Sequence, residues 1–157
     1  PSLLLFGGLL ALSFAYSASP PSRVEFEDPW VEKKGGFLHP KKWREGRENF
    51  TGGWALRHRD SVTVRVTLDE GENRLSLRYK PLQGGTRRKP LPVQSILRGT
   101  VDGKLVNVAR KIPRDWSRDT FTVEGRGGKR EIRIECRRPK PRKGRAAPIL
   151  VDRLTLH

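Results

Sequence analysis

Apolar and polar residues alternate along several short runs of this chain. Valine and leucine alternate with threonine and arginine over residues 62–68, and similar alternation recurs over 75–79, 121–123 and 132–136. Successive side chains of a strand point to opposite faces, so a period of two indicates half-buried antiparallel strands. No stretch has the longer apolar period of a helix. The pattern predicts an all-β protein.

Turn-forming residues separate these runs. Glycine accompanies acidic or polar residues at 69–73, at 101–104 and at 125–128, which is typical of hairpin connections. Roughly eight to ten strands at this spacing favour a two-sheet antiparallel β-sandwich. The jelly roll is the natural closure of such a sandwich.

The first residues differ from the rest of the chain. Residues 3–14 are apolar with only Gly, Ala and Ser mixed in, and small residues follow at Ala15 and Ser17. The run is too short for a membrane span and resembles a secretory signal peptide, which we place at 1–17. The chain begins at Pro1 without a basic segment, so we expect this peptide to be truncated. A single exported domain, secreted or periplasmic, is predicted over 18–157.

The charge is strongly unbalanced. The chain has 33 Lys and Arg against 17 Asp and Glu, a net charge of +16, and 22 of the cations are arginine. Arginine binds carboxylate, sulfate and phosphate groups with two parallel hydrogen bonds, which favours an anionic partner. A solvated basic surface without a specific partner is the alternative.

Basic residues concentrate in two segments, 86–90 and 137–145. The second has six cations in nine residues, and its prolines and glycine argue against regular structure. Like charges held in one loop repel each other, and a bound polyanion relieves that repulsion. The alternative is a basic insertion that has no binding function. The candidate ligand-binding residues in this segment are Arg137, Arg138, Lys140 and Arg142.

Acidic residues occur in strand patterns at both chain ends. Glu25 and Glu27 share one face of the run 24–28, and Asp152 falls in phase with the leucines of the run 149–156. A carboxylate on an apolar face requires a cation or several hydrogen-bond donors. We therefore expect the two runs to lie side by side and their three carboxylates to form a hard-cation site, most plausibly for Ca²⁺.

Signatures of catalysis are missing from the sequence. It contains no G-x-S-x-G or phosphate-binding loop, and its three histidines have no metal-type spacing. The single cysteine, Cys136, is in phase with apolar neighbours and is interpreted as a buried, inert thiol. The sequence therefore favours a protein that is not an enzyme.

Six short motifs follow one another along about residues 24–156. They are Glu25-Phe26-Glu27, Gly53-Trp54, Arg78-Tyr79, Asp102-Gly103, Ile112-Pro113 with Trp116, and the closing run Leu150 to Leu156 with Asp152. In this order they resemble the motifs of carbohydrate-binding module families 6 and 35, which have galactose-binding-like jelly-roll folds.

The resemblance implies a non-catalytic sugar-binding module, usually attached to a polysaccharide-degrading domain. It implies a structural Ca²⁺ held by Glu25, Glu27 and Asp152, and a sugar sandwiched between Trp54 and Trp116. Indole rings suit this role because the apolar face of a sugar stacks on them.

One departure from the family pattern changes the expected ligand. Leu150 stands where these modules often carry an asparagine that binds sugar hydroxyls. The basic segment just before it favours recognition of charge instead. We therefore predict an exported module that binds an acidic polysaccharide, containing uronic acids or sulfate groups.

Two alternative functions are retained. The chain is alternatively a structural or cell-envelope-associated β-sandwich that binds an anionic surface polymer or a protein, without a sugar cleft. Nucleic-acid binding suits the charge, since release of counterions from phosphates drives it, but the export signal argues against it.

Overall fold

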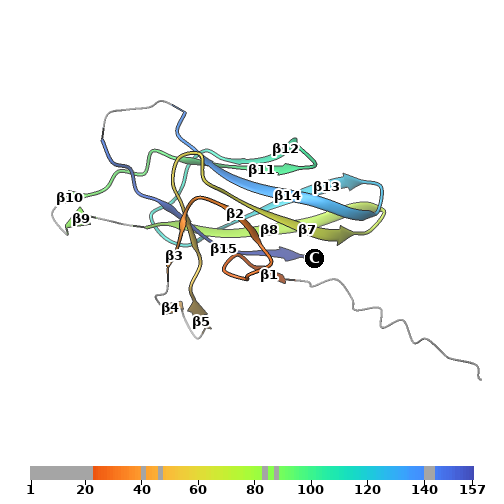
Figure 1. The fold of residues 1–157 in the computed structure, drawn as a ribbon, viewed down its shortest axis with the longest axis horizontal. Coiled ribbons are helices and arrows are strands. Elements are labelled where there is room, and N and C mark those ends of the chain that lie inside the picture. Colours follow the sequence, from red (N-terminus) through yellow and green to blue (C-terminus); the bar gives the residue numbers. More distant parts are fainter. Residues whose placement is uncertain (1–22, 40–41, 46–47, 83–84, 87–88, 140–143) are drawn as a thin grey trace, which may run out of the picture.

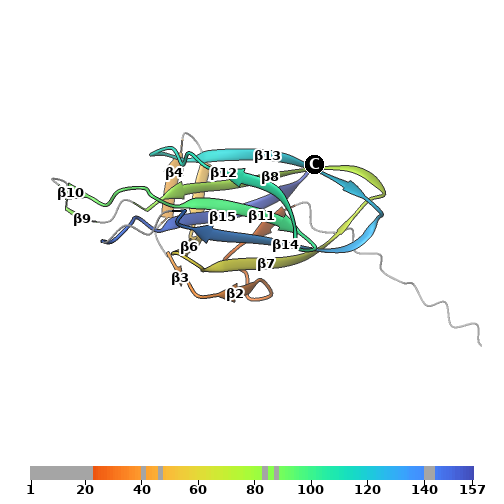
Figure 2. The ribbon, with the colours of Figure 1, turned by 90° about the horizontal axis from the view of Figure 1, so that it is seen from above.

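The computed structural model describes residues 23–39, 42–45, 48–82, 85–86, 89–139 and 144–157, so the predicted signal peptide lies outside it. Strands, turns and loops make up this part of the chain, and it contains no helix able to cross a membrane. Two antiparallel sheets face each other across the apolar core (Figures 1 and 2). This arrangement confirms the predicted all-β sandwich.

The first sheet contains β1 (Arg23–Glu25), β3 (Phe37–Leu38), β6 (Trp54–Leu56), β8 (Gly71–Pro81), β13 (Ser117–Gly125) and β15 (Ile149–Leu156). Its order is β13-β8-β15-β6-β3, and β1 also pairs with β15. Strand β6 pairs with the first half of β15 and β1 with the second half. The last strand of the chain is therefore central to this sheet.

The second sheet contains β2 (Glu32–Lys34), β7 (Ser61–Leu68), β11 (Ile96–Val101), β12 (Lys104–Ala109) and β14 (Gly128–Arg137). Its order is β12-β11-β14-β7-β2. The predicted Asp-Gly turn connects β11 to β12, with φ angles of 47° at Asp102 and 80° at Gly103. Two positive φ values are what a two-residue hairpin turn requires, and this explains the Asp-Gly pair.

Two short hairpins lie outside the sheets. They are formed by β4 (Lys42–Glu45) with β5 (Glu48–Thr51) and by β9 (Gly85–Thr86) with β10 (Lys89–Pro90). Figures 1 and 2 show β4 and β5 on the outer side of the first sheet, running across its strands. The β9–β10 hairpin projects from the end of the sandwich at the left of Figure 1.

The core follows the alternation in the sequence. Val62, Val64 and Val66 on β7 are buried between the sheets, whereas Arg65 between them is exposed. Cys136 on β14 is a free thiol with no exposed surface, and burial raises its pKa to about 11. These findings confirm the predicted strand faces and the buried thiol.

The predicted meeting of the two chain ends is confirmed. Val24 on β1 pairs with Leu154 on β15, and the backbone N–H of Phe26 donates to the carbonyl oxygen of Asp152 at 3.0 Å. The register between β15 and β8 shifts between Val151 and Arg153, which marks a β-bulge at Asp152. This bulge positions the acidic residue discussed below.

Because of this bulge, the face of β15 predicted for Asp152 and Leu150 is wrong. Asp152 was predicted to share the core-facing side of β15 with Leu150 and Leu154. Leu154 does belong to the core, but Leu150 is buried outside the core cluster and pairs with Lys80 on the outer face. An extra residue in a strand resets its alternation of faces, so the leucines before and after the bulge point to opposite sides.

Candidate functional site

A buried group of opposite charges lies at the bulge, on the outer face of the first sheet. Asp152 is 2% exposed, Arg78 4% and Arg153 8%. Asp152 Oδ2 lies 3.7 Å from Arg78 Nη1 and 3.9 Å from Arg153 Nε. Buried charges are retained where an opposite charge compensates them, and the two arginines compensate Asp152 in part.

The two glutamates predicted beside Asp152 are its electrostatic neighbours. Burial, with repulsion from Glu25, raises the pKa of Asp152 to about 6. Burial, with repulsion from Glu25 and Asp152, raises the pKa of Glu27 to about 7. Within the described part of the chain, the buried oxygens Glu27 Oε2 and Asp152 Oδ2 have no hydrogen-bond partner. Both carboxylates therefore lack part of the solvation that their charged forms need.

The chemistry of these oxygens fits a hard cation, which takes carboxylate ligands and would satisfy the two unpaired atoms. Their arrangement does not yet form a site: no three His, Cys, Asp or Glu side chains among the described residues surround one point. Glu25 forms an ion pair with Arg23 instead. The structure thus gathers the predicted carboxylates without arranging them as metal ligands.

Trp54 fixes a turn. Its indole N–H donates to the carbonyl oxygen of Gly35 at 3.0 Å, and its ring packs partly against the core. Lys33 Nζ lies over the same ring, 5.0 Å from its centroid. These contacts tie the connection between β2 and β3 to the sandwich.

Trp116 lies at the start of β13 and contacts two cations of β8. Arg78 Cζ is 4.3 Å from the ring centroid and Lys80 Nζ is 5.2 Å from it. Attraction between a cation and the face of an aromatic ring holds these groups together. Arg78 therefore bridges Trp116 and the buried Asp152.

The two tryptophans do not face each other. Trp54 pairs with Val151, Val151 with Tyr79, and Tyr79 with Ser117, the residue after Trp116. Three strand spacings, about 14 Å, separate their backbones. Trp54 lies on the core-facing side of the first sheet, whereas Trp116 contacts Arg78 and Lys80 on the outer face of that sheet. The structure does not bring the rings together as the two walls of one cleft.

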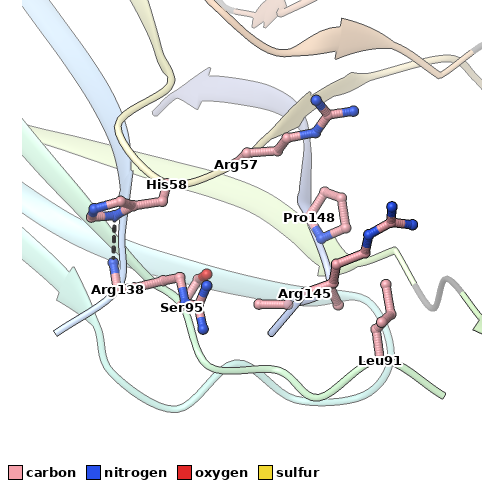
Figure 3. Close-up of a pocket in the computed structure, with 9 residues that line it drawn as sticks. Arg57, His58, Leu91, Ser95, Arg138, Arg145 and Pro148 are labelled. Carbon is pink, nitrogen blue, oxygen red and sulfur yellow. Dashed lines mark hydrogen bonds between the residues drawn. The ribbon is translucent and has the colours of Figure 1, made fainter. Parts of the chain in front are cut away.

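A pocket of about 580 Å³ opens at the end of the sandwich where three connections meet: β6–β7, β10–β11 and β14–β15 (Figure 3). We call it the end pocket. Its walls combine cationic, polar and apolar side chains, and none of the described residues in its lining is acidic. The lining residues are Arg57, His58, Leu91, Ser95, Arg138, Arg145, Ala146, Ala147 and Pro148.

Neighbouring groups hold two of these arginines in place. Arg57 Cζ lies 4.9 Å from the centroid of the Phe37 ring. The backbone N–H of Arg138 donates to His58 Nδ1 at 3.0 Å. Figure 3 shows the side chains of Arg57 and Arg145 extending to one side of the pocket, while His58 and Arg138 close the other. The pocket therefore presents positive charge on two sides.

The guanidinium group of Arg138 is anchored further. Its Nη2 donates to Gln94 Oε1 at 2.6 Å, and its Nη1 donates to the carbonyl oxygen of Gly144 at 3.3 Å. Both acceptors are neutral oxygens. These bonds fix the orientation of the cation at the pocket wall while leaving its charge in place.

The other predicted basic residues are dispersed. Arg137 lies outside the end pocket, and its Nε is 3.0 Å from Glu135 Oε2. Lys140 and Arg142 lie outside the described residues. Among the predicted ligand-binding residues that the structure describes, Arg138 alone lines the end pocket.

Sequence reasoning missed other parts of the end pocket. Neither Arg57 nor His58 belongs to a motif in the sequence. Arg145 was visible only as the last residue of the basic segment. Connections far apart in sequence build this pocket, so no local pattern indicated it.

Comparisons with known proteins identify the fold. No protein-family model and no curated protein sequence matches the chain. Many solved structures do match, and the three described below share 13–15% sequence identity with it.

Three of these structures illustrate the similarity. A family 36 carbohydrate-binding module in complex with calcium and xylotriose has a TM-score of 0.57 and 14% identity, covering 86% of this chain and 98% of that one. A module from Cellvibrio mixtus lichenase 5A in complex with cellotriose scores 0.55 at 13% identity, covering 86% and 95%. A family 35 module from Clostridium thermocellum scores 0.52 at 15% identity, covering 86% and 97%. The predicted resemblance is confirmed at the level of the fold.

Proposed function

We propose that this chain is a non-catalytic carbohydrate-binding module and that its ligand is an acidic polysaccharide, bound in the end pocket. The observation that carries the proposal is the lining of that pocket, where the described part of the chain places three arginines and a histidine but no carboxylate. Its volume of about 580 Å³ lies within the range of small-ligand pockets, about 300–1,000 Å³.

The chemistry of the pocket suits uronic-acid or sulfated sugars. Arg57 and Arg145 extend from one wall, where two parallel hydrogen bonds from a guanidinium group match a carboxylate or sulfate. Leu91 and Pro148 supply apolar surface for the C–H face of a sugar ring.

The stacking role of Trp54 and Trp116 stays a prediction. Neither ring lines the end pocket, and both already make contacts within the protein. Their observed contacts support a role in holding the framework around the pocket and the bulge.

We further propose a structural Ca²⁺ at the carboxylate cluster of Glu25, Glu27 and Asp152. Two buried carboxylate oxygens without a hydrogen bond and two raised pKa values support it. Glu25 would exchange its ion pair with Arg23 for the cation. The metal would neutralise carboxylates that now repel each other.

The calcium proposal has a direct test. Adding Ca²⁺ at neutral pH should raise the melting temperature, and a chelator should reverse the rise, because an ion that binds only the folded state stabilises it. Mg²⁺ at the same concentration controls for ionic strength. An unchanged melting temperature at millimolar Ca²⁺ would remove the metal from the proposal.

Export and attachment to a glycan-degrading domain complete the proposal. The apolar run before the domain supports export. The similar structure from Cellvibrio mixtus is part of a lichenase, which supports association with an enzyme.

Binding to polygalacturonate, alginate and a neutral glucan tests the main proposal. We expect the acidic polymers to bind, the neutral glucan to bind weakly, and affinity to fall as salt rises. The double variant Arg57→Gln/Arg145→Gln should lose about tenfold in affinity, since each lost hydrogen bond to a charged group weakens binding substantially.

The matched control removes two arginines from the opposite end of the sandwich, Arg74→Gln/Arg126→Gln, and should retain affinity. Equal losses in both double variants would indicate attraction by net charge alone, as expected for an envelope protein without a sugar cleft. Salt-independent binding to the neutral glucan would contradict the charge-based site.

A further inference from the structure

A second pocket of about 600 Å³ lies on the outer face of the second sheet. We call it the sheet pocket. Strand alternation explains its position, because Ile96 and Arg98 on β11 point away from the core, whereas Leu97 between them is fully buried. Its lining residues are His58, Ile96, Arg98, Leu105, Val108, Arg110, Arg137, Arg138 and Pro139.

Cross-strand pairs build an apolar floor with cations around it. Arg98 pairs with Val108 on β12, and Ile96 pairs with Arg137 on β14. Leu105 is 51% exposed and lies beside Val108 in the lining of the sheet pocket. The floor therefore offers apolar surface directly beside guanidinium groups.

The sheet pocket and the end pocket share a wall. His58 and Arg138 line both, and the hydrogen bond between them at 3.0 Å forms that wall. The bonds from Arg138 to Gln94 and Gly144 hold its guanidinium group at this boundary. A rigid cationic ridge thus separates two neighbouring pockets.

The surface formed by the two pockets together is positively charged. Among the residues that the structure describes, six arginines line the two pockets together, and no Asp or Glu lines either of them. Glu135 compensates Arg137 from outside the lining. A ligand filling only the end pocket would not reach Arg98 and Arg110, which line the sheet pocket alone.

We infer that the ligand is an internal stretch of an acidic polysaccharide, lying across the ridge of His58 and Arg138 with acidic sugars in both pockets. This inference rests on the proposed function and deepens it, because it names the bound unit as a run of charged residues rather than one sugar or a chain end. Linked contacts in two pockets make the second binding event intramolecular, so affinity rises sharply once a chain spans both.

Oligogalacturonides of two to ten residues test the inference with the full chain by titration calorimetry. The variant Arg98→Gln/Arg110→Gln removes two cations from the sheet pocket alone. We expect it to bind the shortest oligomers like the wild type and to lose about tenfold in affinity for the longest. The end-pocket variant Arg57→Gln/Arg145→Gln should lose affinity at every length.

The control variant Arg74→Gln/Arg126→Gln should bind every oligomer like the wild type, and melting temperatures check that all variants are folded. The inference is overturned if wild-type affinity stops rising at the shortest lengths, or if the sheet-pocket variant and the control lose the same affinity for the longest oligomer.

Two results separate this inference from the proposed function. Loss of affinity in the end-pocket variant, without any length dependence, would overturn only the inference. A wild-type protein that binds no oligogalacturonide would overturn both. A single-stranded oligonucleotide provides a comparison with another polyanion: the control and sheet-pocket variants should lose the same affinity for it. A selective loss in the sheet-pocket variant would reassign that pocket to nucleic acid.

Discussion

The buried carboxylate at the bulge predicts an unusual dependence of stability on pH. The side chain of Asp152 is 3% exposed, and its pKa rises from an ordinary value of 3.8 to about 6. A carboxyl group whose pKa is higher in the folded than in the unfolded state favours folding while it is protonated. That contribution is complete below the unfolded value and is lost as the pH rises through the folded one.

The magnitude follows from the shift. About two pKa units at roughly 1.4 kcal/mol each correspond to a loss of about 3 kcal/mol of stability between pH 4 and pH 7. The overall charge of +16 acts in the opposite direction, because repulsion among cations grows as carboxylates become protonated. A comparison with a variant that differs only at this position separates the two effects.

The perturbation is Asp152→Asn, and the assay is urea unfolding in chelator at several pH values. The free energy of unfolding of the wild type, minus that of the variant, should fall by about 3 kcal/mol from pH 4 to pH 7. Glu27→Gln keeps the contacts of Asp152 with Arg78 and Arg153 and applies the same test to the second raised carboxyl group. Because the pKa of Glu27 is about 7, its difference from the wild type should fall as the pH approaches 7 and be largely lost once the pH passes 7. A difference that stays constant or grows with pH would refute the reasoning.

Three further predictions concern packing. Iodoacetamide should label Cys136 slowly in the native protein at pH 8 and fully after denaturation, because burial raises its pKa to about 11; rapid native labelling would contradict this. Gly53→Ala should cost about 1–3 kcal/mol in urea unfolding, since φ is 139° and a Cβ would lie 2.8 Å from Leu150 Cδ1; unchanged stability would count against the observed packing. Trp54→Phe removes the bond to Gly35 and should cost about 1 kcal/mol without changing polygalacturonate affinity, whereas lost affinity at unchanged stability would instead support the predicted stacking role.

The alternation of residues determined much of the fold. Val62, Val64 and Val66 indicated an inward face because a strand repeats every two residues, and this property is local. The acidic pattern at the two ends indicated that β1 and β15 pair, since a buried carboxylate needs partners. Asp102-Gly103 indicated a hairpin turn through the φ angles that these residues tolerate.

The tertiary structure alone decided where the functional groups lie. The bulge at Asp152 depends on how β8 and β15 match in register, and it moved this carboxylate and Leu150 to the outer face. The end pocket joins Arg57 to Arg145 from connections almost ninety residues apart in the sequence. A strand pattern specifies which side of its own backbone a residue occupies, but only the packing of distant loops specifies which residue it meets.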